Sequence, residues 1–211
     1  MSGDPFFSLP RYVHPREWFE TILPALPLRL PAITIPHAIT YHVMGPGGGV
    51  WSVQLVDGHL QTREGWAERT AVQVAMTVPH LREALTGALR NRFADALRGA
   101  GRPLVLPDLT TLPVDAARMQ ALSSVVGTLA VDVVDRKFSD KYRYVFTFGS
   151  HMAAFDTAST TLEIDADDLV QLLLERGSPW QLLKGPRVRI KGDMDRPAEV
   201  LRALLGRQGP A

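Results

Sequence analysis

The histidines are the first residues to consider for metal or acid–base chemistry, because imidazole binds metals and exchanges protons near neutral pH. A zinc hydrolase places two histidines four residues apart on a helix, or brackets them with carboxylates. The chain has six histidines without such a spacing: His14, His37, His42, His59, His80 and His151. The sequence therefore predicts no metal site and places these imidazoles on the surface or on strands.

Nucleophilic catalysis is not indicated either. The Gly-x-Ser-x-Gly elbow of hydrolases is missing. Ser150 precedes His151, but adjacent residues in a strand or turn point apart. The chain has no cysteine, which excludes thiolate catalysis, disulfides and cysteine-based zinc sites. We therefore expect a protein that is not an enzyme and that uses no cofactor.

Two further groups of residues are candidates for binding ions, and both have a simpler structural explanation. The loop Gly45–Gly49 lacks the Gly-Lys-Ser/Thr ending of a phosphate-binding loop and precedes a strand, so a hairpin connection is expected. Asp165, Asp167 and Asp168 are expected to lie at a helix N-terminus, where each carboxylate is stabilised by about 0.3–1 kcal/mol.

The charge balance does not favour a polyanionic partner. The formal net charge is +1, whereas a nucleic-acid binder is usually clearly basic. A solvated face is the simpler interpretation of the clustered cations, and transient contact with an anionic membrane surface is the alternative. The clusters are Arg82, Arg90, Arg92 and Arg98 on a predicted helix, and Arg187, Arg189 and Lys191 on a late strand.

The elements that must position these residues begin with a short helix around Pro15–Leu23. An extended segment, Pro24–Pro36, follows, in which four prolines forbid a long helix. Period-two alternation then predicts strands at residues 39–44, 50–56, 59–64 and 71–76. Asp57-Gly58 between the second and third strands is a strong hairpin signal.

A long helix is expected next, with Thr77 as its N-cap and an apolar stripe that continues to Leu97. The same order of elements then recurs. Further strands are predicted at residues 128–134, 142–148, 152–157 and 160–164, followed by a helix that Asp165 caps. The sequence RVRIKGDMDRP (187–197) predicts a last strand, a turn at Gly192 and a final helix that begins near Pro197.

This recurrence predicts two pseudo-repeated units after an N-terminal region. The pattern of strand, capping residue and helix in ERTAVQVAMTVPHLREAL recurs in ASTTLEIDADDLVQLLL. The expected organisation is residues 1–38 as a helix and Pro-rich segment, 39–112 as a first unit and 113–211 as a second. The fold class is α+β, with mixed or antiparallel sheets covered on one face by helices.

Three motifs resemble the sterol carrier protein type 2 domain family: Gly49-Val50-Trp51, Asp57-Gly58 and Lys191-Gly192-Asp193-Met194. The resemblance is more specific in residues 128–205. The first unit resembles a degenerate copy, because Pro107-Asp108 stands where the Gly-Asp corner would be.

The resemblance implies a non-catalytic carrier with an apolar cavity between sheet and helices, which binds a sterol, fatty acid or fatty acyl-CoA. The Met194 side chain is expected to fold back and pack on apolar side chains. The alternative is an accessory or interaction module that lost or filled the cavity, or that presents a hydrophobic intermediate to partner enzymes. The expected ligand-binding residues are Phe93, Phe138, Phe155, Trp180, Leu183 and Met194.

The chain is expected to be cytoplasmic. It contains no apolar run near the roughly 18 residues of a membrane helix. Its first residues lack the basic and apolar regions of a secretion signal. The oligomeric state is left open by the sequence.

Overall fold

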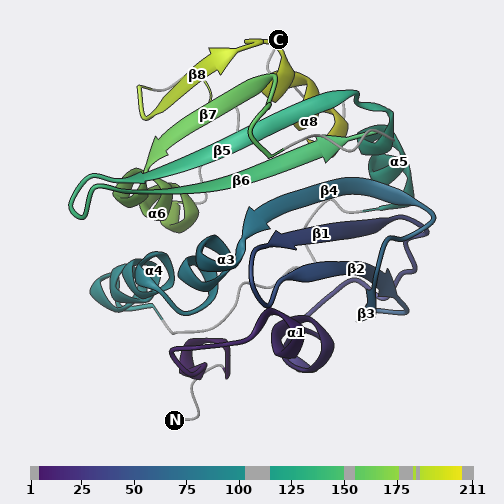
Figure 1. Cartoon of the computed structure of the whole chain (residues 1–211), viewed down its shortest axis with the longest axis horizontal. Coiled ribbons are helices and arrows are strands. Elements are labelled where there is room, and N and C mark those ends of the chain that lie inside the picture. Colours follow the sequence, from purple (N-terminus) through teal and green to yellow (C-terminus); the bar gives the residue numbers. More distant parts are fainter. Residues whose placement is uncertain (1–4, 103–114, 150–154, 176–182, 184–185, 206–211) are drawn as a thin grey trace.

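The computed structural model describes residues 5–102, 115–149, 155–175, 183 and 186–205. Its centre is a mixed sheet of eight strands in the order β3-β2-β1-β4-β6-β5-β7-β8 (Figure 1). The α+β class predicted from the sequence is thereby confirmed. The strands are β1 (Ala38–Met44), β2 (Gly49–Val56), β3 (His59–Glu64), β4 (Thr70–Thr77), β5 (Gly127–Asp135), β6 (Asp140–Phe148), β7 (Thr160–Asp165) and β8 (Val188–Gly192).

The first strands follow the predicted alternation closely. β1 pairs antiparallel with β2 across the Gly45–Gly49 connection, which is therefore a hairpin turn. β2 pairs antiparallel with β3, and both residues of the intervening turn have positive φ, 49° at Asp57 and 78° at Gly58. Two positive φ angles are typical of the type I′ turn that the Asp-Gly signal predicts.

The two halves of the sheet have corresponding strand connections. β1 pairs antiparallel with β2 and parallel with β4. In the same way, β5 pairs antiparallel with β6 and parallel with β7. The halves join where β4 pairs antiparallel with β6. This correspondence is compatible with two pseudo-repeated units, which remain a prediction.

One face of the sheet is apolar and carries the helices. Cross-strand partners share a face, so Ile39, Val53 and Val72 lie together on that face. Helices α5 (Ala116–Ser124) and α8 (Arg196–Leu205) contribute Met119, Leu122 and Val200 to the same core. The opposite face carries polar pairs such as Thr40 with Ser52, 3.1 Å apart. Helix α5 has no counterpart among the predicted elements.

The N-terminal helical region packs aromatic side chains against this apolar face. It comprises η1 (Pro5–Ser8), α1 (Pro15–Glu17), η2 (Trp18–Ile22) and α2 (Leu23–Ala25). Phe19 stacks on Trp51 of β2 with ring centroids 4.9 Å apart. Such a pair contributes about 0.5–1.5 kcal/mol beyond the area that it buries.

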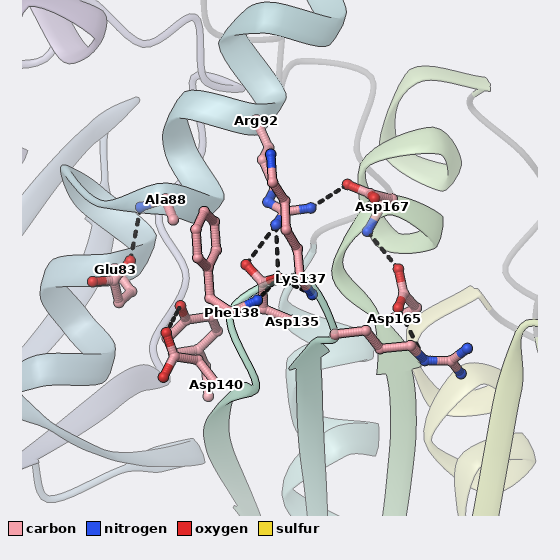
Figure 2. A network of polar contacts seen from close by, with 11 residues as sticks. Glu83, Ala88, Arg92, Asp135, Lys137, Phe138, Asp140, Asp165 and Asp167 are labelled. Carbon is pink, nitrogen blue, oxygen red and sulfur yellow. Dashed lines mark hydrogen bonds and ion pairs between the residues drawn. The ribbon is translucent and has the colours of Figure 1, made fainter.

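The long helix predicted after β4 is two helices, α3 (Val78–Leu85) and α4 (Ala88–Gly99). Thr77 accepts a hydrogen bond from the His80 N–H and caps α3, as predicted. The break has a polar cause. The Thr86 hydroxyl contacts the carbonyl of Arg82 at 3.2 Å, and Glu83 accepts the Ala88 N–H at 2.7 Å, which gives α4 a new start (Figure 2).

A partly buried charge network fixes α4 to the rest of the fold. Arg92 of α4 pairs with Asp135 at the end of β5, at 2.6 Å, and with Asp167 of α6 (Ala166–Glu175) (Figure 2). Asp135 also accepts the N–H groups of Lys137 and Phe138. Figure 1 shows the result: α3, α4 and α6 gather at one end of the sheet, and α5 and α8 at the other.

The predicted C-terminal corner is confirmed. Gly192 ends β8 with φ of +94°, and a Cβ at this position would lie 2.2 Å from the Ser159 carbonyl oxygen. α8 begins directly after Asp195 and has Pro197 in its first turn. Met194 differs from the expectation, because its side chain is 62% exposed instead of packed on the core.

The strand predicted at residues 152–157 lies partly outside the described residues. Its described part begins with a turn at Phe155 and contains no strand.

Candidate functional site

The strongest candidate site is an apolar pocket of about 500 Å³ on the helix-covered face of the sheet. We call it the apolar pocket. Ligand pockets typically have volumes of about 300–1,000 Å³ and are lined mainly by apolar side chains. Among the described residues that line it, none is Asp, Glu, Lys or Arg.

The floor of the apolar pocket consists of alternate residues on neighbouring strands. Ile39 lies beside Val53 of β2 and Val72 of β4. Across the junction of the two halves, Val72 lies opposite Phe148 of β6. Because the side chains of a strand alternate between faces, this register brings residues from six strands to one surface. The floor is Ile39, Tyr41, Val53, Leu55, Leu60, Val72, Val74, Leu129, Val131, Phe146 and Phe148, with Leu60 added by edge strand β3.

Two helices and the Pro-rich segment complete the walls. α5 supplies Met119 and Leu122, and α8 supplies Val200 and Leu204. Residues 30–35 form the third wall, where the Ile35 N–H donates to the Leu55 carbonyl at 2.9 Å. This contact holds the extended segment against β2, in agreement with the predicted extended segment laid across a surface.

Three polar side chains lie among the lining residues. Gln54 donates to the Ile35 carbonyl at 2.7 Å, so its amide stabilises the wall that residues 30–35 form. Burial raises the pKa of the Tyr41 phenol above its ordinary value, which keeps this group uncharged. The Nδ1 atom of His37 is buried and has no hydrogen-bond partner among the described residues. Binding of an apolar molecule needs no more polar groups than these.

None of the described residues among the six predicted ligand contacts lines the apolar pocket. Phe93 packs near Leu97 and Val170 between α4 and α6. Phe138 is 58% exposed on the β5–β6 turn. There its ring lies near the guanidinium of Arg92.

The remaining predicted contacts are also dispersed. Phe155 lies beside His80 and Arg143, and Met194 is exposed. Leu183 is partly buried, and Trp180 lies outside the described residues. The structure therefore does not bring the described members of the predicted set together.

The sequence pattern indicated the strand residues that line the pocket, whereas it did not indicate the lining residues of α5. The alternation of Trp51, Val53 and Leu55 predicts one apolar face. The same pattern cannot separate a packed core from a pocket, because both need apolar side chains at these positions. The walls from α5 depend on an element that periodicity did not reveal.

No group of three or more His, Asp or Glu side chains within the described ranges is placed to hold a metal ion. Among those same residues, no helix has the length and apolar character needed to span a bilayer.

The comparison with known proteins identifies a family match that includes residues lining the pocket. The model of the SCP-2 sterol transfer family matches residues 108–204. The sterol carrier resemblance predicted from the sequence is thereby confirmed for that part of the chain. The SCP-2 match includes α5, β5 to β8 and α8, whereas the tandem with a degenerate first copy remains a prediction.

A solved structure is also similar to part of the chain. It is sterol carrier protein 2 from Yarrowia lipolytica in its apo form, at 13% identity and a TM-score of 0.26. The similarity covers 35% of this chain and 67% of that one. No curated protein matches the chain.

The SCP-2 match includes only part of the apolar pocket. Met119 to Phe148 and the two α8 residues lie inside the matched segment, whereas the lining residues from Leu30 to Val74 precede it. The pocket is therefore composite, with much of its wall supplied by sequence outside the family match.

Proposed function

We propose that this protein is a non-catalytic carrier of a hydrophobic lipid, of the sterol, fatty acid or fatty acyl-CoA class. The apolar pocket is its binding site. The observation that carries this proposal is the uncharged lining of a pocket that joins β1 to β6 with α5 and α8. The SCP-2 match, which includes both helices, supports the same conclusion.

Burial of the lipid supplies the binding free energy in this proposal. Each methylene that leaves water contributes about 0.8 kcal/mol. About ten buried methylenes would contribute about 8 kcal/mol before the cost of ordering the ligand is subtracted. This is why such a site needs neither a catalytic group nor a metal.

The ligand contacts are the floor and wall residues of the apolar pocket, in place of the six side chains expected from the sequence. Val131 and Phe146 are suited to this role, because both are only partly buried and both line the pocket. Their remaining exposed surface would be covered by the lipid. The expected cytoplasmic location is part of this proposal.

The first test is chemical identification of the bound lipid. Protein purified under native conditions should carry a lipid that native mass spectrometry detects and that organic solvent extracts. A protein that carries no lipid and binds no added fluorescent fatty acid or sterol would contradict the proposal. That result would favour the alternative of an interaction module without a ligand.

The second test fills the pocket. Val131→Trp should reduce the affinity for a fluorescent fatty acid at least about tenfold, because the indole occupies the volume of the chain. The control is Val56→Trp on β2, since Val56 is also partly buried but does not line the pocket. Circular dichroism of both variants verifies the fold. Equal affinities in the two folded variants would argue against this site.

A further inference from the structure

A polar pocket adjoins the apolar pocket at the start of β1. Its volume is about 460 Å³, and His37 lines both pockets. We call it the polar pocket. It is lined by His37, Trp66, Ala67, Glu68, Arg69, Thr70, Gln73, Gln120, Ser123 and Gly149. An apolar pocket that shares a lining residue with a hydrogen-bonding one corresponds to the two ends of an amphiphile.

His37 marks the boundary between the two environments. It directly precedes β1, and its Nδ1 atom is buried without a hydrogen-bond partner in the described part of the chain. Buried polar atoms in proteins nearly always have a partner, and an exception requires an explanation. A ligand whose polar group lies at the boundary would provide the missing partner.

A backbone hydrogen bond places the main chain of Arg69 next to this position. The Ala38 N–H donates to the Arg69 carbonyl at 2.9 Å, which places Arg69 beside the residue that follows His37. Arg69 and Glu68 are exposed, and neither has an ion pair within the described ranges. An unpaired guanidinium presents a planar fork of donors that matches a carboxylate. The amides of Gln73 and Gln120 add further donors to the same pocket.

We propose that the polar pocket is the head-group site of the apolar pocket, and that it receives the carboxylate of a long-chain acid between His37 and Arg69. This inference rests on the proposed function and adds the chemistry of the ligand's polar end. All its charged determinants lie before residue 108, outside the SCP-2 match. The first half of the chain thus sets the head-group selectivity.

The test compares a fluorescent long-chain fatty acid with its methyl ester, which has the same chain and no charge. The acid should bind roughly three- to tenfold more tightly than the ester at neutral pH. Arg69→Gln should remove most of this difference. Glu68→Gln should increase it, because the variant loses a repulsive charge from the same pocket. Each substitution should change the affinity for the ester less than the affinity for the acid.

Arg202→Gln is the matched control. Arg202 is exposed on α8, a helix that lines the apolar pocket, but it does not line the polar pocket. Removal of this charge should leave the ratio of acid to ester affinity unchanged. A reduction as large as that of Arg69→Gln would show a general effect of net charge and overturn the assignment.

Trp66 gives a second readout that is independent of affinity. Its indole lines the polar pocket and is 42% exposed, whereas Trp18 and Trp51 are buried. The acid should shift a component of the protein emission that disappears in Trp66→Phe, and the ester should shift it less. Equal binding of acid and ester, with no effect of Arg69→Gln, overturns the head-group site but leaves the carrier function intact. Failure of both probes to bind overturns both.

Discussion

Val72 of β4 and Phe148 of β6 lie directly opposite each other, although they belong to different halves of the chain. Both side chains line the apolar pocket. Their pairing makes one sheet and one pocket from two segments that the sequence predicts to be separate units. The stability of one half therefore depends on the other.

This relationship predicts that the chain unfolds in one cooperative transition. In a Trp180→Phe variant, the emission of Trp18, Trp51 and Trp66 reports on the first half, and far-ultraviolet circular dichroism reports on the helices and strands of both halves. In a urea titration, the two signals should have the same midpoint, as two-state unfolding requires. Separate midpoints would mean that the halves are independent domains.

A substitution at the C-terminal corner should destabilise the protein. Gly192→Ala places a Cβ 2.2 Å from the Ser159 carbonyl oxygen and forces a side chain into a φ of +94°. We expect the free energy of unfolding to fall by roughly 2 kcal/mol or more. The control is Gly99→Ala near the end of α4, where nothing lies within 4 Å of the new Cβ. There the stability should stay unchanged or rise by up to about 1 kcal/mol.

The Arg92 network should be sensitive to the loss of its buried carboxylate. Asp135 has a side chain that is 0% exposed, and it faces the guanidinium at 2.6 Å. Asp135→Asn leaves the partly buried Arg92 charge poorly compensated and should cost about 3 kcal/mol of stability. Asp95→Asn removes an exposed partner of Arg98 and should cost less than about 1 kcal/mol. Chemical denaturation measures both, and similar losses would contradict the role of burial.

Stability should decrease at alkaline pH. Burial raises the pKa of Tyr41, Tyr142 and Tyr144 above the value of an unfolded chain, to about 12 for Tyr142. The folded protein therefore retains protons that the unfolded chain releases above pH of about 10. The contribution of these tyrosines to the free energy of unfolding should be constant below this pH and fall as the pH rises further. Tyr41→Phe should reduce that fall, as urea titrations at several alkaline pH values can measure.

Local sequence patterns predicted the sheet and its corners because these depend on neighbouring residues. Asp57-Gly58 specifies its turn through two positive φ angles. Thr77 specifies the start of α3 through one hydrogen bond. The break between α3 and α4 was not predicted, because it depends partly on the Thr86 hydroxyl and its contact with the Arg11 carbonyl, 2.9 Å away and distant in sequence.

The apolar character of the candidate site was predictable from the sequence, whereas the position of the apolar pocket was not. Apolar strand faces indicate that a core or pocket exists, and they contain Val53, Val74 and Phe146. Which of these residues lies beside unfilled volume depends on how β4 pairs with β6 and on where α5 lies. The predicted aromatic residues Phe93 and Phe138 are instead packed between helices or exposed on a turn. No sequence pattern within either half of the chain specifies how β4 pairs with β6 or where α5 lies.

The junction of β4 and β6 also has a consequence for how the chain folds. The β1–β2 and β2–β3 hairpins join residues that are near in sequence, whereas Val72 must find Phe148 across a long loop. Closing a long loop costs entropy before its contacts repay that cost, so non-local pairings form slowly. We therefore expect the β4–β6 junction, and with it the apolar pocket, to form after the local hairpins on the folding pathway. Under the proposed carrier function, a lipid bound at this junction would stabilise the pairing of the two halves.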